Sequence, residues 1–173
     1  IVGDDNVVEA VQIGSDNLAL GSIVGDSNEL TLYQEGFANE SLTDITGNGN
    51  MVEVSQEGDG GPFGFIFNRA VNTITGDDNE VVIDQGDGGH WTNNTIEGSS
   101  NNLSIEQSGE WHEAYVSNLV GDGNEVSIEQ DGYFSVATVS NVLGDDNELD
   151  FESEGDRNTI ALSVEGDDNA IEI

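Results

Sequence analysis

The feature that most constrains this chain is a tandem repeat of about 22 residues, each repeat holding two arms of alternating polarity. In segment 28–34, Leu30 and Leu32 fall on one side of an extended chain, and Glu29 and Thr31 fall on the other. Successive side chains of a strand point to opposite faces, whereas a helix repeats every 3.6 residues. The pattern therefore predicts strand, turn, strand and turn in every repeat.

A glycine marks the start of each repeat, with spacings of 22, 22, 29, 22, 23, 23 and 22 residues. These glycines are Gly3, Gly25, Gly47, Gly76, Gly98, Gly121, Gly144 and Gly166. The one long interval contains an apolar loop insertion at 59–67. Repeats of this size cannot bury a face alone and stack on their neighbours, so we expect a single domain over 1–173.

The first arm of each repeat places an Asn, two apolar residues and a Gln on one face. If equivalent arms stack, the apolar residues form a dry core and the amides form hydrogen-bonded ladders. The predicted amide ladders are Gln12, Gln34, Gln56, Gln85, Gln107 and Gln130, with Ser153 breaking the series, and Asn6, Asn28, Asn50, Asn79, Asn101, Asn124, Asn147 and Asn169. The predicted core residues are Leu30, Leu32, Val52, Val54, Val81, Ile83, Leu103, Ile105, Val126, Ile128, Leu149 and Phe151.

The second arms share one apolar residue, two positions before the next glycine, and are otherwise small or polar. That residue is Ile23, Ile45, Ile74, Ile96, Leu119, Val142 or Val164. Two of these arms are one residue longer, which suggests a β-bulge. We expect the first arms to contribute most of the apolar burial.

Together the arms predict an all-β solenoid of seven to eight strand-turn-strand rungs, forming two facing, parallel, in-register sheets. A rung is complete only between two others, and neither terminal segment carries a Pro, a Lys or a helix-like cap. We therefore expect end-to-end stacking into a filament through Ile1, Val2, Ile171 and Ile173. The insertion carries Phe63, Phe65, Ile66 and Phe67, which predict either a local cap or a lateral contact between filaments.

Charge restricts the partners, because 36 acidic residues stand against two basic ones, Arg69 and Arg157, for a net charge of -34. A basic face for nucleic acid or anionic membrane is absent, and no apolar run is long enough to insert into a bilayer. Outward acidic residues recur in each first arm and would stack like charges, so we expect salt or calcium to raise stability or assembly. The favoured interpretation is that the acidic residues keep the outer face solvated, and the alternative is that the acidic turns hold calcium or other cations loosely. No other cofactor is expected.

Chemistry has little support in this sequence. His90 and His112 each neighbour a tryptophan, Trp91 and Trp111, in successive second turns. A stacked metal or acid–base pair is one interpretation, and turn decoration or an adhesive aromatic patch is the favoured one. The sequence predicts no catalytic residue and no defined metal site, and the protein is not expected to be an enzyme.

The segment Asn28–Ser41 resembles the curlin repeat of bacterial curli fibres, in which Ser or Asn precedes alternating aliphatics, Gln, Gly and Asn. The match recurs at 50–58, 101–109 and 124–132. The resemblance implies a secreted subunit that polymerises into an extracellular, amyloid-type fibre of biofilm matrix or adhesive surface. The usual second Gln of curlin is replaced here in the other arm. Alternatives are a monomeric acidic adhesin or calcium-binding surface module, and an enzyme on a parallel β-helix.

Overall fold

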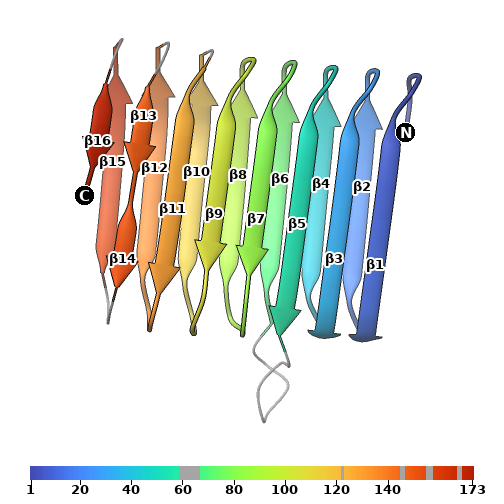
Figure 1. The fold of residues 1–173 in the computed structure, drawn as a ribbon, viewed down its shortest axis with the longest axis horizontal. Helices are drawn as coiled ribbons and strands as arrows, with labels where there is room; N and C mark the ends of the chain where they lie inside the picture. The colour runs from blue at the N-terminus through green and yellow to red at the C-terminus, as the bar shows by residue number, and fades with distance from the viewer. Residues whose placement is uncertain (59–66, 122, 145–146, 155–157, 167–168) are drawn as a thin grey trace.

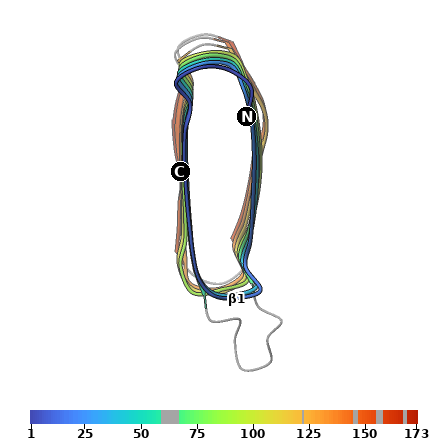
Figure 2. The ribbon, with the colours of Figure 1, turned by 90° about the vertical axis from the view of Figure 1, so that its right-hand side faces the viewer.

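The computed structural model describes residues 1–58, 67–121, 123–144, 147–154, 158–166 and 169–173. The described residues form a β-solenoid of about seven turns, in which two parallel sheets face each other (Figures 1 and 2). This confirms the predicted all-β architecture with rungs of about 22 residues. No helix in the described part of the chain is long and apolar enough to cross a membrane.

First arms build one sheet and second arms build the other. The first sheet contains β1 (Val7–Ser15), β3 (Glu29–Phe37), β5 (Met51–Gly58), β7 (Glu80–Gln85), β9 (Asn102–Gln107), β11 (Glu125–Asp131), β13 (Glu148–Asp150), β14 (Glu152–Glu154) and β16 (Ala170–Glu172). The second contains β2 (Leu18–Val24), β4 (Glu40–Thr46), β6 (Arg69–Thr75), β8 (Trp91–Glu97), β10 (Glu113–Val120), β12 (Val136–Leu143) and β15 (Thr159–Glu165).

Equivalent residues of successive rungs pair directly, so each repeat position forms a column along the solenoid. Leu30 pairs with Val8 on one side and Val52 on the other. The register in which β8 pairs with β10 shifts between Val116 and Leu119. The register in which β12 pairs with β15 shifts in the same way between Ser140 and Leu143. These irregularities are the bulges that the two longer arms predict.

The core lies between the sheets and follows the predicted inward positions. The first-arm pairs from Leu30 and Leu32 to Leu149 and Phe151 are all buried, as are the seven apolar residues of the second arms. Among the described residues the two sheets bury equal numbers of apolar side chains, a more even division than predicted. The buried apolar residues of the second sheet include three alanines, Ala70, Ala114 and Ala137. The first arms therefore still supply the larger side chains.

Close packing of the turns explains the repeated glycines. Gly47 has a φ of +136° and sits directly below the carbonyl oxygen of Gly76, where a Cβ atom would overlap that oxygen. A residue with a side chain is disfavoured there both by backbone conformation and by contact with the next rung. Glycine therefore allows the turns to stack at the spacing of the hydrogen-bonded strands.

Candidate self-assembly surface

The glutamines of the first sheet form a continuous hydrogen-bonded column. Each side-chain amide donates to the Oε1 atom of the glutamine in the following rung, from Gln12 to Gln130, with N···O distances of 2.7 to 3.0 Å. Several also donate to a carbonyl at the start of the second sheet, as Gln34 does to Leu18 at 3.0 Å. Ser153 takes the next position, accepts from Asn158 at 2.9 Å and ends the column.

The asparagines of the first turn form a second column whose amides point the opposite way. Asn28 donates to Asn6 at 3.0 Å, and the same bond recurs in every later rung up to Asn169, which donates to Asn147 at 3.0 Å. The Oδ1 atom of Asn6 also accepts the backbone N–H of Asn28 at 2.9 Å. In each inner rung the Asn side chain therefore donates to the preceding rung, whereas the Gln side chain donates to the following rung.

A third column, which our sequence analysis did not include, lies in the second turn. Asn17 accepts the backbone N–H of Asn39, and Asn39 accepts that of Asn68. The next two positions are His90 and His112, whose rings stack with centroids 5.1 Å apart and an interplanar angle of 3°. The tetrad of a glycine, two residues and an asparagine at Gly36–Asn39 was the signal that could have revealed this column.

Both histidines reproduce the hydrogen bonds of the asparagine they replace. The Nε2 atom of His90 lies 2.6 Å from the carbonyl oxygen of Gly86, matching the bond from Asn39 to the carbonyl of Glu35. The Nδ1 atom of His90 accepts the backbone N–H of His112. Burial lowers the pKa of His90 to about 4, and it also lowers the pKa of His112. Because both nitrogens of each ring are engaged, the two histidines are not available to a metal ion. Both histidines are buried, so the exposed aromatic side chains here are those of Trp91 and Trp111.

The predicted stacking ends lie at the edges of the sheets. β1 and β16 are the outermost strands of the first sheet, and Val8 of β1 is 43% exposed, whereas its register partner Leu30 is fully buried. Val2 forms a bridge to Val24, and both Ile1 and Val2 are exposed. Ile171 packs against the core, and Ile173 is exposed.

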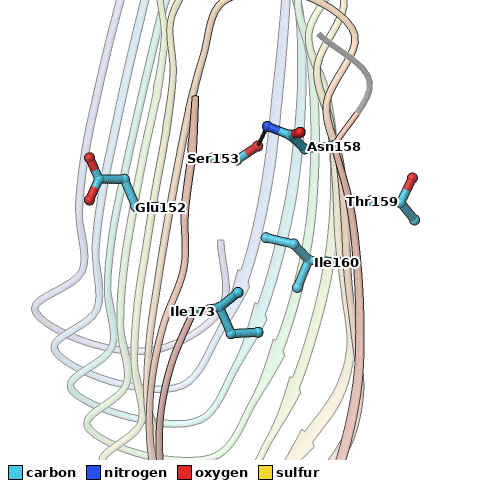
Figure 3. Close-up of a pocket in the computed structure, with 6 residues that line it drawn as sticks. All are labelled: Glu152, Ser153, Asn158, Thr159, Ile160 and Ile173. Atoms are coloured by element: carbon cyan, nitrogen blue, oxygen red, sulfur yellow. Dashed lines mark hydrogen bonds between the residues drawn. The ribbon is translucent and has the colours of Figure 1, made fainter. Parts of the chain in front are cut away.

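A hollow of about 330 Å³ opens between the sheets near β16, lined in part by Ser153, Asn158, Ile160 and Ile173. Figure 3 shows Ile160 and Ile173 pointing into this space from opposite sheets. The apolar lining continues the line of the core, so this edge offers surface that another rung would cover.

The first rung is also largely apolar on its outer faces, with Glu9 as the carboxylate among the outward residues of β1, and our sequence analysis missed this. Val7, Val11, Ile13 and Leu18 are exposed, where later rungs carry residues such as Glu29, Tyr33, Glu35 and Glu40. Comparing each column down the repeats would have revealed the difference. Of the predicted lateral contact, Phe63, Phe65 and Ile66 lie outside the described residues, and Phe67 is exposed.

The acidic side chains occupy the outer face of the first sheet, as predicted. Register pairing aligns Asp84, Glu106, Glu129 and Glu152 in four consecutive rungs, all exposed. Acidic turn residues also bond between rungs, since Asp26 accepts the backbone N–H of Asp4 at 2.7 Å. The described residues contain no group of three or more acidic or histidine side chains suited to a metal ion.

One family matches this arrangement of repeats. The sequence model of the curlin associated repeat matches residues 3–35, 25–58 and 98–132, which together make up more than half of the chain. No curated protein and no solved structure matches the chain.

Proposed function

This chain belongs to the curlin associated repeat family, and we propose that it is a structural subunit of an extracellular, curli-like filament. In this proposal it self-assembles at the cell surface or in biofilm matrix and performs no catalysis. The observation that carries the proposal is the in-register stacking of identical positions, with amide columns that run through successive rungs. Such stacking is the interaction by which amyloid-type fibres add further copies of a segment.

Head-to-tail addition would form between two molecules the same parallel strand pairing that joins successive rungs within one molecule. The edge strand β1 exposes Val8 and Gln12, the positions that inner rungs bury. If β16 of one molecule docked on β1 of the next, Asn169 would accept from Asn6 as Asn6 accepts from Asn28. The glutamine column would not continue in the same way, because it stops at Gln130.

Lateral bundling is the second part of the proposed assembly. Val7, Val11, Ile13 and Leu18 place apolar side chains on the outside of the first rung, where stacking along the axis does not cover them. Exposed apolar groups of this kind favour contacts with another protein surface. The chain has a net charge of -34, so the carboxylates of the remaining rungs repel other filaments and oppose such contacts elsewhere along the filament.

The experiment that tests this function is electron microscopy of the purified chain, with a substitution placed on the stacking edge. We expect filaments from the wild type and none from Val8→Lys, because a charge would be buried at the junction. Met51→Lys is the matched control, since Met51 is exposed on the outer face of β5 and should leave filaments intact. Wild-type protein that remains monomeric at high concentration and high salt would contradict the proposal.

A further inference from the structure

Aromatic side chains gather at the second turns, where the strands of the second sheet begin, and lie outside the amide columns. The residue just before the second-turn asparagine or its replacement is Phe67, Gly89, Trp111 and Phe134 in four successive rungs. Trp111 and Phe134 stand there with φ of +66° and +57°, a conformation that bulky residues rarely adopt. The equivalent residue of other rungs, such as Asp16, also has a positive φ, so the turn itself requires this conformation. Glycine adopts it without strain and a bulky aromatic residue does not, so the stability of the turn does not explain the aromatic residues.

Gly89 leaves a gap in this aromatic column. One face of Trp111 stacks on Phe134, with centroids 6.4 Å apart and an interplanar angle of 7°. On the other side of Trp111 the equivalent residue is Gly89, which has no side chain, and Phe67 follows one rung further on. The backbones of rungs two apart are separated by about 9.5 Å. A ring at the level of the Gly89 rung would lie about 4.8 Å from each neighbouring rung, which leaves room for one ring between the side chains on either side.

The gap is part of a hollow of about 490 Å³, which lies within the usual size range of small-molecule sites. Trp91, the first residue of β8, lines it and is 42% exposed, and Trp111 is 39% exposed. The register places Arg69 beside Trp91, and Glu113 lies on the far side of Trp91 in the next rung. Polar groups therefore border an aromatic surface.

The polar groups of the hollow are already positioned. The Nε atom of Arg69 donates to Glu40 at 2.8 Å, and its guanidinium lies 5.2 Å from the ring centroid of Trp91. Glu113 accepts from the hydroxyl of Tyr115 at 3.0 Å. Arg69 neutralises Glu40 and occupies the cation site on Trp91, so a cationic ligand would have to displace it.

From this geometry we infer that the hollow is a binding site for a neutral sugar unit of a glycan. A pyranose ring presents a face of C–H groups that packs on an indole, and a rim of hydroxyl groups that bonds with carboxylates and a guanidinium. An anionic glycan would be repelled by the charge of -34. A purely aromatic ligand would desolvate Glu113 and Arg69 without replacing their bonds to water. This site is independent of the proposed polymerisation and is present in every copy of the chain.

Tryptophan fluorescence tests the inference directly, because Trp91 and Trp111 are the only two tryptophans of the chain. The probes are the soluble hexasaccharides of glucose and of N-acetylglucosamine, titrated separately into the full chain. We expect a saturable change in emission with at least one of them. Half-saturation should not move between about 0.05 and 0.5 M salt, since a neutral ligand has no charge to screen.

Two substitutions address the two walls of the gap. Gly89→Phe restores the missing ring, which the turn accepts at Phe134 with positive φ, and should abolish binding while both tryptophans remain. Trp111→Ala should weaken binding at least tenfold, with Trp91 as the remaining reporter. Tyr33→Ala, on the outer face of the other sheet, should leave half-saturation within twofold. Circular dichroism of each variant verifies that the strands are retained, and Gly89→Ala provides a smaller plug if Gly89→Phe does not fold.

Several results would overturn the inference. The inference is wrong if neither hexasaccharide produces a saturable change in emission. It is also wrong if folded Gly89→Phe binds as the wild type does. A response to polylysine alone that disappears in salt would assign the hollow to a cationic partner instead. Emission that depends only on protein concentration would assign it to a second copy of the chain.

Discussion

The Nδ1 atom of His90 accepts the backbone N–H of His112 at 3.3 Å, and the Nδ1 atom of His112 accepts that of Ser135 at 3.1 Å. Each ring also lies within hydrogen-bonding distance of a carbonyl through Nε2, which fixes the neutral form with its proton on Nε2. A second proton would occupy the nitrogen that accepts the next rung. The column therefore tolerates histidine only while it is uncharged.

The first prediction is that acid destabilises the solenoid through these histidines. Burial, opposed in part by the carbonyl of Gly86 and the carboxylate of Asp87, lowers the pKa of His90 from 6.5 to about 4. Between these values the unfolded chain binds more protons, so stability is complete above about pH 6.5 and falls as the pH drops toward 4. The loss from His90 is on the order of 3 kcal/mol.

Thermal melts of wild type and of the double variant His90→Asn, His112→Asn check this prediction. Asparagine occupies the same position in other rungs, so the variant should fold and lose only the histidine part of the pH dependence. The two proteins differ only at these two positions, so the difference between their curves isolates the histidines. Identical curves for the two proteins from pH 7 to 4 would contradict this account of His90 and His112.

The features of this solenoid that follow from strand periodicity were predictable from the sequence. Period two determines which face of a strand a residue occupies, so Leu30, Gln34 and their equivalents could be assigned without coordinates. The role of His90 depended on the three-dimensional equivalence of an imidazole and an amide, which no spacing reveals. The aromatic hollow likewise depends on how Trp91 and Trp111 lie across rungs, and the outward positions of a repeat carry no pattern that specifies this.

The second prediction concerns the interior of the glutamine column. Replacing Gln85 with Leu would leave the Nε2 of Gln56 without its acceptor at 2.8 Å and the Oε1 of Gln107 without its donor at 3.0 Å. Each buried polar group that loses a partner costs about 1–3 kcal/mol, so for the two groups we expect a loss of roughly 2–6 kcal/mol. Glu53→Gln is the control, because Glu53 lies on the exposed face of β5 and has no carboxylate beside it in its column. Equal denaturation midpoints for the two variants would rule out a stabilising role for the column.

The third prediction uses a pair of glycines. Gly47→Ala should cost about 2–4 kcal/mol, because φ is +136° and the new Cβ would overlap the carbonyl oxygen of Gly76. Gly86→Ala should be tolerated, since the nearest atom to its Cβ, the carbonyl oxygen of Gln107, is 4.0 Å away. Chemical denaturation of both variants measures the difference. Comparable losses at Gly47 and Gly86 would mean that the stacked first turns do not require glycine.

The fourth prediction is that the aligned carboxylates of the first sheet oppose stability at low salt. Glu106 stands between Asp84 and Glu129 in the register, with about 4.8 Å between rungs, and like charges directly opposite each other on neighbouring strands are destabilising. Glu106→Gln should therefore raise stability by about 0.2–1 kcal/mol at low ionic strength. The gain should shrink in about 1 M salt, where the Debye length is near 3 Å.

The control for Glu106 is Glu53→Gln, because Glu53 lies between Thr31 and Val82 and has no carboxylate beside it in its column. It should change the melting temperature less than Glu106→Gln does at low salt. Calcium at millimolar concentration should reproduce the effect of salt on the wild type and give a smaller rise in the Glu106 variant, as loose binding along the carboxylate column requires. A Glu53→Gln gain equal to that of Glu106→Gln, or a wild-type melting temperature indifferent to both salt and calcium, would show that Asp84, Glu106 and Glu129 do not repel one another enough to affect the fold.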